Sequence, residues 1–281
     1  MTRTLLLTST ALRHSFVINH LAARLDLVGV WRETKSFQPE RSAQTTADRR
    51  TIDEHFAARE RSERLYFEDH ARLRLNAGAH LREVGPGGIN DPTARAQMIA
   101  LAPEVLLVYG TGLLGHDLIE AFEGRIVNLH LGLSPYYRGS GTNFWPLVNR
   151  EPEYVGATIH YLDAGIDTGP IIAHVQPSIS ADDGPHDVGN KTILEAAASL
   201  AEVAEAVVKG DVRGIPQTHR GRLYQRKDFN AEAVRRLNEN FLTGMMQDYL
   251  ANKSTRDATL QLRTLVASTR PGVSWPRQAG G

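Results

Sequence analysis

Cysteine is absent from the 281-residue sequence, so the chain has no disulfide, no thiolate zinc site and no cysteine nucleophile. Long apolar runs are also missing. No segment approaches the roughly 20 apolar residues that a membrane-spanning helix needs. The apolar run that follows Met1 is too short for a secretory signal peptide. These absences predict a cytoplasmic protein with no membrane partner.

An excess of charge of either sign is missing too. The 32 basic residues balance the 32 acidic ones, which argues against a nucleic-acid partner, although a neutral total does not exclude a local basic patch. A metal site is also not expected. The histidines at 116, 160, 174 and 186 include no pair at i, i+4 spacing with a carboxylate partner.

A strand–helix–strand pattern opens the chain. Residues 4–8 are apolar, a helix with Phe16, Ile18 and Leu21 on its core side follows, and Leu27–Trp31 is apolar again. This βαβ spacing predicts parallel strands. The first turn has none of the glycines that a dinucleotide-binding site requires. With further apolar runs at 104–109 and 127–131, we expect an α/β fold: a mostly parallel twisted sheet with helices on both faces.

The expected organisation is a catalytic domain over residues 1–215, a helical C-terminal extension over 216–270 and a disordered tail over 271–281. Within the first part, residues 33–84 are rich in Arg and Glu, and they suggest a helical insert that continues to about Leu73. Such a segment is usually a solvated helix packed by one stripe. It also follows the carboxyl end of a strand, where a lid or recognition element is placed in α/β proteins.

Three polar side chains carry the chemistry. Asn128 and His130 are two apart on an expected strand and project to the same face, and Asp167 lies in a turn flanked by Gly165 and Gly169. An amide N–H stabilises a developing oxyanion. His130, or Asp167 through a bound water, accepts a proton, and Asp167 orients the imidazole. Each element alone is more often structural than catalytic.

The sequence segments around these residues are a more specific signal than the residues alone. The first segment is Asn128-Leu129-His130-Leu131-Gly132-Leu133-Ser134-Pro135, followed by Tyr137-Arg138-Gly139. The second runs from Gly156 to Gly169 and ends Asp163-Ala164-Gly165-Ile166-Asp167-Thr168-Gly169. Residues 103–210 resemble the catalytic core of the 10-formyltetrahydrofolate-dependent formyltransferases, a family that includes glycinamide ribonucleotide transformylase, methionyl-tRNA formyltransferase and sugar N-formyltransferases. The resemblance implies formyl transfer with Asn128, His130 and Asp167 as the catalytic trio.

The resemblance also implies where the folate co-substrate lies. Its cleft would run between the segment 108–114 and the loop 162–167. The residues expected to contact it are Val108, Tyr109, Gly110, Gly112, Leu113, Leu114, His160, Asp163 and Gly165. The sequence departs from the family at Gly132, where serine is frequent, so the loop is expected to differ there.

The acceptor is left open by these residues. A small-molecule amine is expected, with an amino sugar carried on a nucleotide as the leading hypothesis. The alternatives are an amino acid or hydroxylamine side chain of a secondary metabolite, methionyl-tRNA, water in a hydrolase, or a non-catalytic folate-binding protein. Candidate acceptor contacts are Ser9, Thr10, Arg13, His14 and Arg138, of which Arg138 either binds a phosphate or pairs with a carboxylate. A homodimer is also left open.

Overall fold

The computed structural model describes residues 1–34, 43–163, 165, 167–217 and 220–265. Its main sheet has seven strands in the order β3-β2-β1-β4-β5-β7-β8. The bounds are β1 (Arg3–Ser9), β2 (Asp26–Glu33), β3 (His80–Val84), β4 (Val105–Val108), β5 (Ile126–Leu131), β7 (Ala157–Tyr161) and β8 (Ile171–Val175). The first five strands of this order, from β3 through β2, β1 and β4 to β5, are parallel to one another. Strand β7 is antiparallel to both of its neighbours, β5 and β8. The expected mostly parallel α/β sheet is confirmed.

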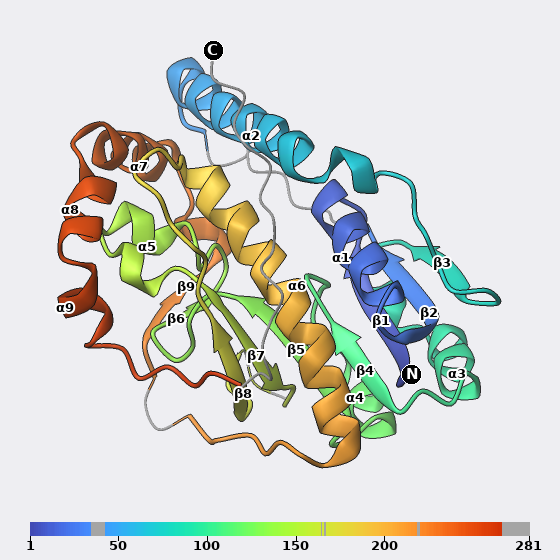
Figure 1. The fold of residues 1–281 in the computed structure, drawn as a ribbon. Helices are drawn as coiled ribbons and strands as arrows, with labels where there is room; N and C mark the ends of the chain where they lie inside the picture. The colour runs from blue at the N-terminus through green and yellow to red at the C-terminus, as the bar shows by residue number, and fades with distance from the viewer. Residues whose placement is uncertain (35–42, 164, 166, 218–219, 266–281) are drawn as a thin grey trace.

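Helices cover both faces of this sheet (Figure 1). The bounds are α1 (Leu12–Ala22), α2 (Thr46–Phe67), α3 (Pro92–Ala100), α4 (His116–Ala121), α5 (Trp145–Val148) and α6 (Pro185–Lys209). Alternate strand residues face opposite sides. Leu6 therefore lies in a core with α1 and α6, and Leu5 and Leu7 lie in a second core with α3 and α4.

Helix α6 covers the face of the sheet on which Leu6 lies. Its buried positions include Ile193, Ala197, Leu200 and Ala204, which recur at helical spacing. The helix begins at Pro185, where a missing N–H costs nothing, and ends at Gly210 in the left-handed conformation. The small alanine side chains let the long helix lie directly on the sheet.

The expected helical insert over residues 33–84 is only partly helical. Helix α2 begins after a capping box of Thr45 and Asp48, and it ends at Phe67 instead of continuing to Leu73. Residues His80–Val84 are not helical but form the edge strand β3, parallel to β2. Prediction from sequence missed β3 because its side chains are exposed or half-buried, so it has no apolar alternation; backbone pairing with β2 defines it.

The expected helical C-terminal extension is present, and it also contains a strand. Arg222–Tyr224 form β9, which pairs in parallel with β6 (Tyr137–Gly139). Asn230 caps α7 (Ala231–Leu242). Gly244 adopts a left-handed conformation before α8 (Met245–Ala251), which α9 (Lys253–Asp257) follows. The predicted disordered tail at 271–281 lies outside the described residues.

Within the part of the chain that the structure describes, every helix is too short or too polar to cross a membrane.

Candidate active site

The three predicted catalytic residues come together at one side of β5. Asn128 and His130 lie on the same face of this strand, and the turn after β7 brings Asp167 against the imidazole. His130 Nδ1 lies 3.2 Å from Asp167 Oδ1. Strand β5 continues past the end of β4, since Val108 pairs with Asn128. His130, two residues after Asn128, therefore lies beyond the last residue of β4.

The carboxylate of Asp167 determines the protonation of His130. Because a carboxylate accepts hydrogen bonds, Nδ1 carries the proton and the lone pair of the neutral ring is on Nε2. Nε2 is buried and has no hydrogen-bond partner among the residues that the structure describes. Burial raises the pKa of Asp167, but the neighbouring His130, His160 and the Gly139 N–H outweigh it and lower the pKa to about 2. Asp167 is thus an anion at neutral pH.

A second histidine fixes the orientation of Asn128. His160 Nδ1 donates to the Tyr161 carbonyl at 2.8 Å, so His160 Nε2 accepts from Asn128 Nδ2 at 3.0 Å. Burial lowers the pKa of His160, which favours the neutral ring that this chain of bonds needs. His160 is 2% exposed. It was expected to contact folate; its ring nitrogens instead serve Asn128 and Tyr161, and its contact with folate stays a prediction.

The turn that carries Asp167 is shaped by its own side chains. Asp163 Oδ1 accepts from the Gly165 N–H at 3.0 Å and from the Thr168 hydroxyl at 2.9 Å. Asp163 and Gly165 were expected to contact folate, and in the structure both build this turn. Thr168 was not singled out from the sequence, although an Asp and a Thr five residues apart around glycines are a signal for such a turn.

Most of the predicted folate loop lies after β4. The side chains of Val108 and Tyr109 are 3% and 2% exposed and point into the two different cores, so any contact they make with a ligand would be through the backbone. Gly110 abuts the His14 ring. Leu113, by contrast, is 77% exposed, and Leu114 is partly buried on the second core. The exposed Leu113 side chain is available to a planar apolar ligand.

Two residues, Glu33 and Asn90, hold this loop in place, and the sequence had indicated neither of them. The buried carboxylate of Glu33 accepts from the Gly112 N–H at 2.5 Å and from the Gly87 N–H at 2.7 Å. Asn90 accepts from the Gly115 N–H at 2.7 Å and donates to the Leu113 carbonyl at 3.0 Å. The Gly112 N–H is therefore used within the protein. The only available signal was the position of Glu33 at the carboxyl end of β2.

The predicted acceptor residues fall into two groups. Ser9 and His14 are buried; the Ser9 hydroxyl donates to the Glu33 carbonyl, and His14 Nδ1 is bonded to the Thr8 hydroxyl. Arg13, beside Thr10 at the first turn, forms an ion pair of 2.7 Å with Glu63 of α2.

Glu63, which is buried, also binds Arg59 at 2.9 Å, so two guanidinium groups share one carboxylate between α1 and α2. Arg138 is 8% exposed and makes no ion pair with any described residue. Of its two expected roles, pairing with a carboxylate is not seen in the described part of the chain.

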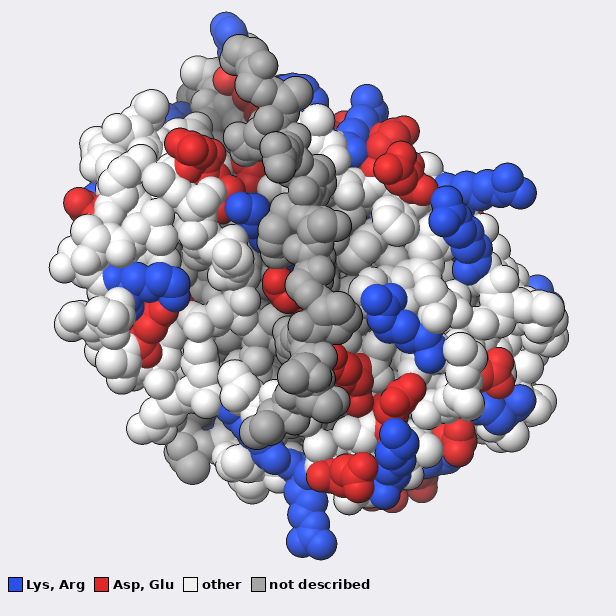
Figure 2. Space-filling model, in the orientation of Figure 1, with Lys and Arg blue, Asp and Glu red and all other residues white. Residues whose placement is uncertain are grey.

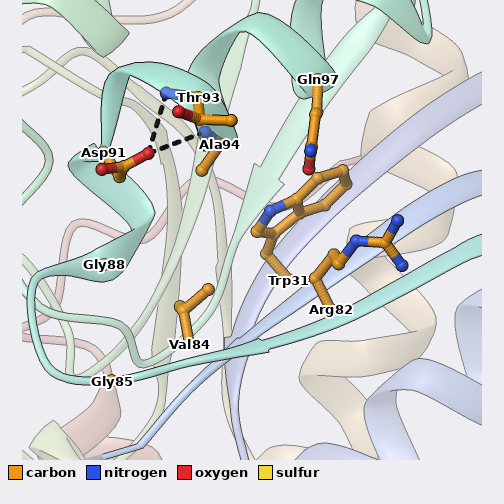
Figure 3. Close-up of a pocket in the computed structure, with 9 residues that line it drawn as sticks. All are labelled: Trp31, Arg82, Val84, Gly85, Gly88, Asp91, Thr93, Ala94 and Gln97. Atoms are coloured by element: carbon orange, nitrogen blue, oxygen red, sulfur yellow. Dashed lines mark hydrogen bonds between the residues drawn. The ribbon is translucent and has the colours of Figure 1, made fainter.

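Other surfaces do not coincide with the trio. A pocket of about 430 Å³ lies between β2, β3 and α3, and none of its lining residues was predicted to be functional (Figure 3). Among the described residues on the face in Figure 2, basic and acidic side chains are interspersed. Among the described residues, no three His, Asp or Glu side chains are grouped closely enough to hold a metal ion.

Comparison with known proteins agrees with this geometry. A family profile described as formyl transferase matches residues 48–204. Methionyl-tRNA formyltransferase of Thermodesulfovibrio yellowstonii is 29% identical over 159 residues, which are 56% of this chain and 51% of that protein. The chain thus spans about half the length of this curated relative.

Two solved structures show the same fold. A sugar N-formyltransferase from a Shewanella species has a TM-score of 0.53 at 15% identity, covering 81% of this chain and 78% of its own. WlaRD, a sugar 3N-formyl transferase solved in the presence of dTDP and 5-N-formyl-THF, has a TM-score of 0.51 at 16% identity, covering 82% and 72%. The family profile matches more than half of the residues of this chain. The chain therefore belongs to the formyl transferase family.

Proposed function

We propose that the protein transfers the formyl group of 10-formyltetrahydrofolate to a primary amine of a small-molecule acceptor, and that this acceptor is a nucleotide-linked amino sugar. The observation that carries the proposal is the state of His130. Its Nδ1 is held by Asp167 at 3.2 Å, and its buried Nε2 has no partner among the described residues. A base held in one tautomer with its lone pair available is what amine acylation requires.

Each residue then has a separate task. The donor supplies a formyl group bound to nitrogen. The Asn128 amide, oriented by His160, retains one N–H to stabilise the negative charge that develops on the acyl oxygen. The amine nitrogen attacks the formyl carbon, and His130 Nε2 accepts the proton that this nitrogen loses. The bond between the formyl carbon and the donor nitrogen then breaks, and the His130 imidazolium returns the proton to that nitrogen, which releases tetrahydrofolate. Asp167 stabilises this imidazolium, because it is already ionised and in contact with the ring.

The surroundings of the trio fit a folate. Its pterin is planar and largely apolar on its faces; Leu113 and Leu114 in the loop after β4, and Leu162 at the start of the turn after β7, offer exposed or half-buried apolar surface. The loop that carries the first two is held by Glu33 and Asn90. We therefore place the donor between the segment 108–114 and the turn 162–167, as proposed from the sequence.

The acceptor is proposed on weaker but independent grounds. Arg13 and Arg59 share the single carboxylate of Glu63, which leaves a net positive charge suited to a phosphate. A structurally similar sugar formyltransferase was solved with dTDP. Methionyl-tRNA is disfavoured because the net charge is zero and because basic and acidic side chains are interspersed among the described residues on the face in Figure 2.

The test is to mix the pure protein with 10-formyltetrahydrofolate and a panel of amines, and to follow release of tetrahydrofolate by absorbance and formylated product by mass spectrometry. We expect turnover with a nucleotide-linked amino sugar that is lost in His130→Ala. Release without any amine would indicate a hydrolase. No release with any acceptor, while the folate still binds, would contradict the proposed activity.

A further inference from the structure

We propose that Gln217 is a positioning residue that clamps the turn of Asp167 and thereby holds the catalytic carboxylate against His130. Its kinetic consequence rests on the proposed formyl transfer, whereas its structural consequence does not. Gln217 follows α6, and it is separated from Asp167 by 50 residues.

The contact is made by one amide nitrogen. Gln217 Nε2 donates to the Asp167 carbonyl at 2.8 Å and to the Gly169 carbonyl at 2.9 Å. Both partners are carbonyl oxygens, which only accept, so the group between them must be the NH₂ and not the amide oxygen. The two bonds connect both sides of Thr168, the residue after Asp167. The amide thus spans the turn as a brace.

The turn needs a brace because its backbone is strained. Asp167 has a φ of +51°, in the left-handed region. Residues with a Cβ adopt this conformation rarely, although aspartate and asparagine do so more often than most. The backbone geometry nevertheless directs Oδ1 to His130 and Oδ2 to the Gly139 N–H at 3.1 Å. If the turn relaxed, the carboxylate would lose both partners.

Gln217 is itself anchored next to the turn. Ile215, two residues earlier, forms a two-bond antiparallel bridge with Ile171, with both N–H···O distances 2.8 Å. Ile171 begins β8, directly after the turn. The brace is therefore attached to the sheet edge from which the turn departs, and it is not a mobile surface side chain.

Two substitutions test the clamp. Gln217→Ala removes both bonds, and Gln217→Glu keeps the shape but replaces the NH₂ donor with a carboxylate facing two carbonyls. We expect kcat to fall about 10- to 100-fold in each, because a displaced catalytic group loses its alignment. KM for donor and acceptor should change little. Gln176→Ala is the matched control: Gln176 Nε2 also donates to a backbone carbonyl, that of Glu153 at 2.9 Å, away from the trio.

A second readout does not require activity. The Asp167 carboxyl can be titrated by ¹³C NMR and assigned by its absence in Asp167→Asn. Its pKa, about 2 in the intact protein, should rise toward its ordinary value of 3.8 in both Gln217 variants and stay unchanged in Gln176→Ala. A shifted titration in a protein that formylates no amine would support the clamp and refute the proposed function. An unchanged titration and an unchanged kcat in folded Gln217→Glu would overturn the clamp.

Discussion

At the scale of single residues, the site is defined by two imidazoles in the same tautomer. His130 and His160 both donate from Nδ1, to Asp167 and to the Tyr161 carbonyl respectively. The lone pair on His160 Nε2 is used by Asn128, whereas that on His130 Nε2 has no partner among the described residues. From this difference we propose that His160 orients Asn128 and that His130 takes part in the reaction.

Replacing Asp167 with asparagine tests this assignment. Asparagine tolerates the left-handed backbone, but it no longer stabilises an imidazolium, so we expect kcat to fall by about 10²- to 10⁴-fold in steady-state assays. The folded pKa of about 2 lies below the ordinary 3.8, so the carboxylate stabilises the fold above the latter pH and ceases to do so as pH falls through about 2.

The stability loss in Asp167→Asn should accordingly be about 2 kcal/mol near neutrality and should vanish between about pH 4 and pH 2. Urea unfolding at several pH values measures it, with Asp211→Asn as an exposed control. A loss that persisted unchanged at low pH would show that ionisation of Asp167 is not its source.

Gly132, at which the loop after β5 was expected to differ, has no room for a side chain. Its φ is +150°, and a Cβ there would lie 2.5 Å from Thr142 Cβ and 2.9 Å from His130 Nε2. We expect Gly132→Ala to destabilise the fold by about 1–3 kcal/mol and to reduce kcat. Gly124→Ala is the control, since Gly124 also has a positive φ but nothing within 4 Å of its added Cβ. Equal effects in urea unfolding would mean that backbone strain, and not the clash, decides.

At the scale of elements, connections between strands are held by polar side chains from other strands. Glu33, at the end of β2, accepts bonds from two loops at once. The parallel pairing of β6 with β9 holds Gly139, whose N–H contacts Asp167. Each element therefore contributes to the site through the backbone of a neighbouring segment.

Glu33→Ala should weaken donor binding more than catalysis. It leaves the N–H groups of Gly87 and Gly112 without their acceptor, so the loop 110–115 loses its fixed shape. We expect KM for the formyl donor to rise about 10-fold, equivalent to the loss of about 1.4 kcal/mol, with kcat changed less. Glu83→Ala, which removes an ion pair of Arg32 at 2.6 Å, is the control. A fall in kcat at unchanged KM would refute a role in donor binding.

At the scale of the whole molecule, the C-terminal helices pack on the rest of the chain. A third core joins Trp145 of α5 and Val188 of α6 to Leu237 of α7. Gln217 contacts the turn of Asp167, and β9 pairs with β6, so we propose that the residues on both sides of the expected boundary near residue 215 unfold as one unit.

Leu237→Ala tests this continuity. The side chain is 1% exposed, so its truncation should cost about 2–5 kcal/mol. We expect one cooperative unfolding transition, shifted as a whole, when fluorescence and circular dichroism are followed together in urea. Two separate transitions would show that α7 unfolds independently of the sheet.

The sequence by itself determined the fold class, and it placed Asn128 and His130 on one face, because both features have local signals. Buried parallel strands are continuous apolar runs, and Asn128 and His130 share a face through the two-residue period of a strand. Only the tertiary structure decided β3, β9 and the residues that support the site. Their side chains are exposed or polar, and the bonds of Gln217 and Glu33 join residues 50 and 79 apart in the chain, a separation that leaves no pattern in the sequence.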